Sequence, residues 1–358
     1  MASEKKVLTN YNFLRILAIL MVISTHMLGQ TYIADAATEP VRWHVREIIR
    51  TLTLTCNGLF FMLSGRFIID KYDGRIWSFY WDRIVKIGIP VFLVTTFNYI
   101  YIFGFSPDIA YIKNYLKLFL QAKVLGYLWF VFALAGFYLA VPFLSRMLVG
   151  MPKGEKKALI AVSFIYFLVQ DLYHLEGMEQ VLTSYIFYSW VFYCVLGYLL
   201  DTIEFKKGQE IFLIALGAVG LLISSVEEFY IPGKNAYIHD YAPSMILMTV
   251  SVYIIVTRYG SFITRHIEKG INFVARYIFF VYLFHGFTQN LLIMNILTET
   301  PVGYGMWIGL TLLSFSMALI MAMIAYHLIY KPFILRLIPK KKGASEKKEN
   351  YSVKNEGK

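Results

Sequence analysis

Residues 11–28 have the sequence YNFLRILAILMVISTHML, and this stretch decides the fold. It is apolar almost throughout and, at about 1.5 Å per residue, is long enough as a helix to cross a hydrocarbon core of roughly 30 Å. Comparable runs of about 18 to 22 residues recur along the whole chain. Because the segment carries Arg15 within it and lacks a small-x-small cleavage site, we interpret it as a retained membrane helix and not as a signal peptide.

The composition is that of a chain whose main solvent is lipid. Hydrophobic residues make up 58% of the 358 residues and charged residues 16%, whereas soluble domains have roughly 45–50% and 25%. The net charge is +11, but Lys and Arg gather in short connections and in the tail from Lys340 to Lys358. That distribution indicates membrane topology and attraction to anionic lipids, and it argues against a nucleic-acid-binding surface. Cys56 and Cys194 lie within apolar runs, so neither a disulfide framework nor a metal site is predicted.

We predict an all-α, polytopic membrane protein with about ten transmembrane helices. The connections that follow the even-numbered segments are rich in Lys and Arg, which places them and both termini in the cytoplasm. The connections at 29–49 and 106–126 break this pattern, since they put basic residues on the outer face. Those residues face an anionic substrate or headgroup, or else reflect a locally weak charge bias. The predicted segments span residues 11–28, 50–69, 85–105, 127–149, 157–174, 181–200, 210–229, 241–258, 273–297 and 304–330.

The chain reads as one membrane domain, because no internal repeat of fixed period is evident. Residues 1–10 form a cytoplasmic N-terminus, residues 11–330 the transmembrane domain, and residues 331–358 a basic cytoplasmic tail. We expect the tail to be disordered, because it is charged and poor in apolar residues. The predicted location is a cell membrane crossed many times, and the oligomeric state is not predicted.

Arg15 and His26 are the first candidates for chemistry, because ionisable side chains inside a membrane helix cost about 2.5–3.5 kcal/mol on insertion scales. Eleven residues separate them, which is about three helical turns plus 20°, so both project from one face about 16 Å apart along the axis. With the N-terminus inside, Arg15 lies near the cytoplasmic end and His26 near the outer end. The alternative is that Arg15 reaches the inner headgroups while His26 forms a hydrogen bond at the outer interface.

Two further segments carry candidate binding residues. Ser64 and Gly65 put small side chains in the inner half of the second segment, where they admit either a thin ligand chain or a neighbouring helix. Arg83 and Lys86 belong to a basic amphipathic stretch that leads into the third segment. They either bind a phosphate group of a cytoplasmic ligand or anchor the segment by the positive-inside rule.

These motifs, in this order, resemble those of the membrane-bound acyltransferase-3 family, whose members O-acylate cell-envelope glycans and related acceptors. The resemblance extends over most of the chain. One position departs from the family pattern, since Lys86 stands where the second of two arginines is usual, and lysine lacks the planar fork of a guanidinium. The motifs are the Arg-x10-His opening within Asn12–His26, Phe60-Phe-Met-Leu-Ser-Gly65, the basic segment that leads to Pro90, Leu128-Trp-Phe-Val-Phe-Ala-Leu134 and Phe280-Val-Tyr-Leu-Phe-His285.

The resemblance implies an O-acyltransferase of the bacterial plasma membrane. The donor would be cytoplasmic acyl-CoA, acetyl-CoA by family habit, and the acceptor a hydroxyl of an envelope polysaccharide or lipid-linked sugar; no bound cofactor is expected. We hypothesise that His26 is the general base, with an acyl-histidine intermediate as the other route, and that Arg15 steadies the donor or a developing charge. The acyl-CoA would bind at Arg83, Lys86, Ser64 and Gly65.

The same resemblance suggests residues that line the cavity. These are Asn57, Trp129, Tyr282 and His285, although a lone histidine among apolar residues is usually a hydrogen-bonded structural residue. Two other functions remain open at this point. A small-solute transporter fits ten spans with scattered polar groups, but the inverted repeats and broken helices of many transporters are not evident. A membrane anchor or sensor would leave Arg15 and His26 as interface residues.

Overall fold

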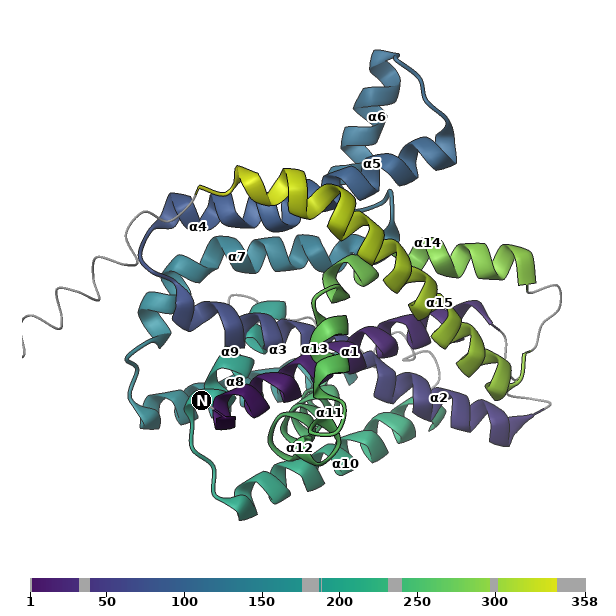
Figure 1. The fold of residues 1–358 in the computed structure, drawn as a ribbon. Coiled ribbons are helices and arrows are strands. Elements are labelled where there is room, and N and C mark those ends of the chain that lie inside the picture. The colour runs from purple at the N-terminus through teal and green to yellow at the C-terminus, as the bar shows by residue number, and fades with distance from the viewer. Residues whose placement is uncertain are drawn as a thin grey trace, which may run out of the picture.

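A computed structural model of the protein describes residues 2–31, 39–175, 187, 189–230, 240–296 and 302–339. All regular structure in these ranges is helical, which confirms the predicted all-α class (Figure 1). Short 3-10 turns lie at Ile69–Lys71, Gly126–Leu128 and Leu335–Leu337, and π-helical turns at Ile84–Gly88, Ile255–Tyr259 and Tyr326–Ile334. The α-helices are α1 (Ala2–Gln30), α2 (Pro40–Leu54), α3 (Cys56–Ile68), α4 (Ile76–Arg83), α5 (Ile89–Phe103), α6 (Ile109–Leu120), α7 (Trp129–Leu148), α8 (Lys153–Leu175), α9 (Trp190–Thr202), α10 (Lys207–Tyr230), α11 (Pro243–Ile254), α12 (Ser261–Thr264), α13 (Glu268–Ala275), α14 (Ile278–Ile296) and α15 (Tyr304–Ala325).

Several helices have the length and composition of membrane spans. In the described residues seven qualify, and two shorter apolar helices occur at Trp190–Thr202 and Pro243–Tyr259. A helix falls within each of the ten predicted segments, although residues 181–186 and the tail from 340 onward lie outside the described residues. The number of about ten crossings and the cytoplasmic side of both termini stay predictions. The seven spans are Leu8–Gln30, Pro40–Lys71, Ile76–Phe103, Gly126–Leu148, Lys207–Glu227, Ile278–Ile296 and Tyr304–Leu337.

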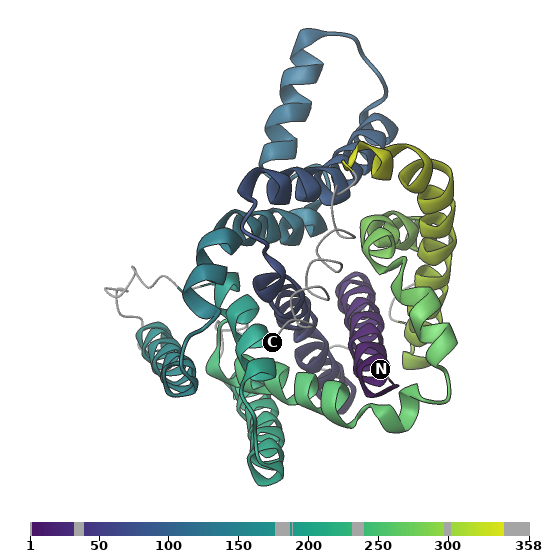
Figure 2. The same ribbon diagram turned by 60° about the vertical axis from the view of Figure 1, so that its left-hand side comes forward.

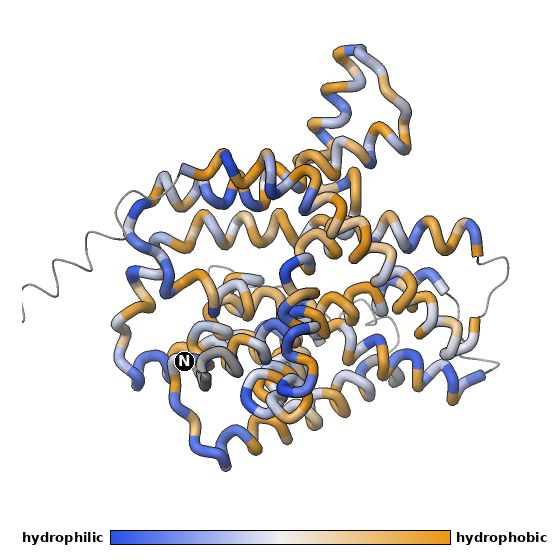
Figure 3. The backbone as a smooth tube through the Cα atoms, in the orientation of Figure 1, coloured by the Kyte–Doolittle hydropathy of each residue, from blue (hydrophilic) through white to orange (hydrophobic). Residues whose placement is uncertain are grey.

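The distribution of hydropathy along the helices agrees with this reading. Hydrophobic residues fill the middle of most long helices, and hydrophilic residues gather where the chain turns (Figure 3). Helix α5 packs against α14, whereas α6 and the connection before it extend away from the rest of the bundle (Figures 1 and 2). The carboxylate of Asp108 caps α6, because its Oδ1 accepts the backbone N–H of Ala110 at 3.1 Å.

Two of the predicted connections contain helical residues. Helix α2 begins within 29–49 and continues to Leu54, and α6 lies within 106–126. Hydropathy does not reveal α2, because this helix is amphipathic with its polar side inward. It buries Glu47 and Thr51 and exposes Val45 and Ile48, as suits a helix with lipid on one side and protein on the other. Glu47 is neutralised in place by ion pairs with Arg46 and with Arg50, the latter at 2.9 Å.

Helix α1 runs through the interior of the bundle and contacts α2, α3, α13, α14 and α15 (Figure 2). Hydrogen bonds to distant segments hold it along its length. Asn12 donates to the side-chain oxygen of Asn272 at 2.8 Å, and Gln289 donates to the backbone oxygen of Ile23 at 2.7 Å. The position of α1 is therefore fixed from both ends, and so are the side chains that it carries.

Close packing of two helices explains Gly65. A Cβ atom at Gly65 would lie 1.7 Å from the backbone oxygen of Cys194 in α9, and one at Gly197 would lie 2.1 Å from the backbone oxygen of Met62 in α3. The two glycines thus let α3 and α9 touch along their backbones. Of the two readings of Gly65, the geometry favours a helix contact.

We therefore expect Gly65→Ala to lower the free energy of unfolding by about 1–3 kcal/mol, because the added methyl group meets backbone that cannot give way. The measurement is the melting temperature of the purified protein in detergent. Gly136→Ala is the control, since a Cβ at Gly136 in α7 meets nothing within 4 Å. Equal melting temperatures of the two variants would contradict the packing argument.

Candidate functional site

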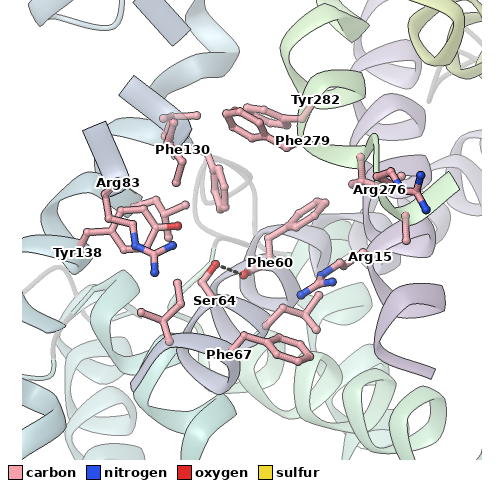
Figure 4. Close-up of a pocket in the computed structure, with 17 residues that line it drawn as sticks. Arg15, Phe60, Ser64, Phe67, Arg83, Phe130, Tyr138, Arg276, Phe279 and Tyr282 are labelled. Atoms are coloured by element: carbon pink, nitrogen blue, oxygen red, sulfur yellow. Dashed lines mark hydrogen bonds between the residues drawn. The ribbon is translucent and has the colours of Figure 1, made fainter. Parts of the chain in front are cut away.

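A cavity of about 420 Å³ lies beside the N-terminal half of α1. Its wall comes from α1, α3, α7, α14, the end of α4 with the π-helical turn after it, and the α13–α14 connection (Figure 4). One part of the wall is basic and the other aromatic. The lining residues are Arg15, Phe60, Leu63, Ser64, Phe67, Ile68, Arg83, Ile87, Phe130, Val131, Leu134, Tyr138, Ala275, Arg276, Ile278, Phe279 and Tyr282.

Arg15 and Arg83 reach into the cavity from opposite sides, with Ser64 between them (Figure 4). The guanidinium of Arg15 lies 4.5 Å from the centre of the Phe67 ring and donates to the side-chain oxygen of Asn12 at 2.9 Å. Within the described residues, neither arginine forms an ion pair with a carboxylate. A ring face or an amide offsets only part of a full positive charge, so this end of the cavity is suited to an anion.

The surroundings of Arg83 strengthen this conclusion. Its guanidinium lies 4.8 Å from the Phe79 ring and 5.3 Å from the Tyr138 ring. Its Nε atom is buried and has no hydrogen-bond partner among the residues that the structure describes. A buried N–H without an acceptor destabilises the fold, and an anionic ligand would supply that acceptor. Ser64, in contrast, donates its hydroxyl hydrogen to the backbone oxygen of Phe60 at 2.8 Å, so its oxygen is left as an acceptor (Figure 4).

The other end of the cavity is aromatic. Phe130 lies 5.8 Å from Phe60 and 5.6 Å from Tyr282, measured between ring centres. The hydroxyl of Tyr282 donates to the backbone oxygen of Tyr127, so its hydrogen is not available to a ligand. This end suits the uncharged part of a ligand whose charged part rests on Arg15 and Arg83.

A pair of histidines lies one helical turn beyond the aromatic end. The rings of His26 in α1 and His285 in α14 have their centres 5.5 Å apart. His285 is fully buried and lies against Tyr282, whose ring centre is 5.3 Å away. The two residues of the opening motif thus lie in different surroundings. Arg15 lines the cavity, and His26 packs against His285.

Four of the other predicted site residues lie outside the cavity wall. Lys86 pairs with Asp82 at 3.3 Å, and Gly65 packs against α9. Asn57 donates to the carboxylate of Asp240 at 3.0 Å. Trp129 packs on Trp190, with 5.1 Å between ring centres. The predicted residues that the structure brings to the cavity are therefore Arg15, Ser64, Arg83 and Tyr282.

Sequence reasoning missed Tyr138, Phe279 and Arg276 among the lining residues. A signal for Tyr138 was present, because it follows Val131 and Leu134 at helical spacing and so extends the face of that motif. Phe279 likewise precedes Tyr282 by one turn. Arg276 contributes to the wall, but in Figure 4 its guanidinium points away from the cavity, and no motif indicated it.

No group of three or more His, Cys, Asp or Glu side chains suited to a metal ion occurs in the part of the chain that the structure describes. The fold and the cavity are those of a multi-pass membrane protein with a basic cavity near a histidine pair. The family described as an acyltransferase domain of the acyltransferase-3 type matches residues 8–327. The chain belongs to this family, which confirms the resemblance found in the motifs and favours an enzyme over a transporter. No curated protein and no solved structure matches the chain.

The polar contact of Asn57 yields a prediction on stability. Asp240 lies in the turn before α11, and burial raises the pKa of its carboxyl group to about 6, from a usual value near 3.8. The folded protein therefore holds this proton to higher pH than the unfolded chain does. Stability falls as the pH rises from about 4 to about 6, and it is level above that range.

We expect Asp240→Asn to remove this loss, because the amide is uncharged and can still accept from Asn57. The variant should match the wild type near pH 4 and should exceed it by about 2–3 kcal/mol above pH 7. Melting temperatures of both proteins in detergent over this pH range test the prediction. A difference between them that does not vary with pH would contradict it.

Proposed function

We propose that the protein is an integral-membrane O-acyltransferase that moves an acyl group, most simply acetyl, from cytoplasmic acyl-CoA to a hydroxyl of an envelope polysaccharide or lipid-linked sugar. Membership in the acyltransferase-3 family supports the class of reaction. The observation that carries the choice of donor is the cavity in which Arg15 and Arg83 have no carboxylate partner among the described residues. Such a site favours a ligand with phosphate groups.

The proposed donor matches the two ends of the cavity. The phosphates of coenzyme A would accept hydrogen bonds from Arg15 and Arg83, and the buried Nε of Arg83 would gain its missing acceptor. The uncharged pantetheine arm would pass Ser64 and the aromatic residues toward the histidine pair. Arg15 and His26 lie about 16 Å apart along the helix axis, a distance that an extended pantetheine arm spans. This separation supports a role for Arg15 at the head of the donor over a role at the reacting carbonyl.

The proposed chemistry takes place at His26. Its imidazole takes the proton of the acceptor hydroxyl while that oxygen attacks the thioester carbonyl. A C–O bond forms, the C–S bond breaks, and the proton passes from the imidazole to the departing sulfur. General base catalysis of this kind typically contributes about 10²- to 10⁴-fold. An acyl-histidine intermediate is the second route, and it differs because labelled acyl group would stay on the protein when no acceptor is present.

For donor binding we expect Arg83→Ala to raise KM for acetyl-CoA about 10- to 100-fold, with a smaller effect on kcat. The reason is the loss of charge-assisted hydrogen bonds worth about 1.5–3 kcal/mol. Release of free thiol by purified protein with acetyl-CoA and an envelope glycan measures both constants. Lys86→Ala is a matched control, because Lys86 is a basic residue of the same segment that pairs with Asp82. If both variants behave alike, the arginines do not define the donor site.

For the chemical step we expect His26→Ala to lower kcat at least about 10²-fold while acetyl-CoA still binds. Transfer of labelled acetyl to the glycan measures the loss. The melting temperature of the variant and its binding of acetyl-CoA show that the fold and the donor site persist. Undiminished transfer by a correctly inserted His26→Ala protein would exclude the assignment of His26.

A further inference from the structure

The hydrogen-bonding state of His285 can be derived from its neighbours. Its Nδ1 lies 2.5 Å from the backbone oxygen of Tyr282. A carbonyl oxygen only accepts, so Nδ1 carries the hydrogen, and in the neutral ring Nε2 carries a lone pair. Nε2 is buried and has no hydrogen-bond partner within the described part of the chain. Tyr282 therefore fixes the tautomer of His285 and aims an acceptor at a place where no donor yet lies within hydrogen-bond distance.

The donor that completes this bond can be found by elimination. Three ring side chains surround His285, namely Tyr127, Tyr282 and His26, with ring centres at 4.5, 5.3 and 5.5 Å. The hydroxyl of Tyr127 already donates to the backbone oxygen of Leu283 at 3.1 Å, and that of Tyr282 donates to the backbone oxygen of Tyr127. The imidazole of His26 is the remaining donor among the three.

The separation of the two imidazoles suits such a bond. A linear N–H···N bond of about 3 Å between two imidazoles puts their ring centres about 5.4 Å apart, since each nitrogen lies about 1.2 Å from its ring centre. The observed 5.5 Å is close to that value. The distance between the ring centres therefore leaves the orientation of the rings, and not the spacing of the two helices, as the variable on which this bond depends.

We propose that His285 is a positioning residue for acyl transfer, whose Nε2 accepts the N–H of His26. The bond leaves the other nitrogen of His26 with its lone pair toward the acceptor hydroxyl. The inference rests on the proposed function and adds the residue that sets the tautomer of the base. When His26 takes the hydroxyl proton, its bond to His285 becomes charge-assisted, which stabilises the imidazolium in the transition state. His285 itself neither gains nor loses a proton.

An orienting histidine fits the membrane setting better than an orienting carboxylate. In hydrolases with a Ser-His-Asp triad, a buried aspartate holds the catalytic imidazole in its tautomer. A carboxylate next to His26 would place an ionised group in the interior of the bundle, at high cost. A neutral His285 with Nδ1 bound to a backbone oxygen supplies the same acceptor without a charge.

The test compares His285→Leu, which removes the acceptor, with His285→Gln, whose Oε1 reaches the place of Nε2. We expect His285→Leu to lower kcat at least about 10²-fold and to leave KM for acetyl-CoA within about threefold of the wild type, because Arg15 and Arg83 are untouched. We expect His285→Gln to recover at least about tenfold in kcat over His285→Leu. Melting temperatures in detergent accompany each assay. If the Leu variant is too unstable to assay, the kcat of the Gln variant is compared with that of the wild type to test whether an acceptor at the position of Nε2 supports the reaction.

A double-mutant cycle separates action through His26 from an independent role. If His285 acts through His26, the His26→Ala/His285→Leu protein is no slower than His26→Ala alone. A further loss in the double variant would overturn the proposal, and so would a kcat of His285→Leu within about threefold of the wild type. A His285→Gln protein as inactive as His285→Leu at an unchanged melting temperature would overturn it too. Failure of the wild type to transfer acetyl would instead refute the proposed function, whereas an inactive His26→Ala beside a fully active His285→Leu refutes this inference alone.

Discussion

The partly buried charge of Arg15 is the constraint on which the site depends. A guanidinium inside an apolar helical bundle is costly unless it is paired, and the protein pairs two of its other interior arginines. Arg66 meets Asp201, and Arg258 meets Glu210 at 2.6 Å. Arg15 has a ring face and an amide in place of a carboxylate. Pairing thus separates the arginines that hold the bundle together from those that face the cavity, and the uncompensated charge is where the proposed donor would bind.

Because α1 is a rigid helix, the position of Arg15 also fixes the position of His26. Because a helix fixes both the angle and the rise between residues, eleven positions bring His26 to the same stripe about 16 Å further on. Hydrogen bonds from Asn272 and Gln289 hold α1 near each end of this interval. Substitutions at those anchors would act on the spacing between donor head and reacting thioester, although neither residue lines the cavity. Asn272 and Gln289 therefore support the candidate site indirectly, by holding α1 in place.

The sequence predicted what local periodicity determines, and it could not predict what distant contacts decide. The shared stripe of Arg15 and His26 follows from helical spacing alone. Lys86 could have been separated from Arg83 on the same basis, because Asp82 stands four residues before it and can neutralise it. A glycine at position 65 looks the same in the sequence whether it contacts a ligand or a helix. Only the position of α9 in the structure distinguishes the two. Helix α2 was not predicted from hydropathy, because its inward face is polar and lowers its mean hydropathy.

The histidine pair shows most clearly which information comes only from the folded structure. His285 alone reads as a structural histidine, and the bond from Nδ1 to Tyr282 is of the kind that such a residue makes. A purely structural role accounts for one ring nitrogen and leaves the other buried without a partner among the described residues. Proteins rarely keep such an atom, and of the three rings packed around His285, only that of His26 has an N–H that is not already committed. The same reasoning applies to Nε of Arg83, so two unmet hydrogen bonds, one near each end of the proposed donor, define the direction in which a reaction would run along α1.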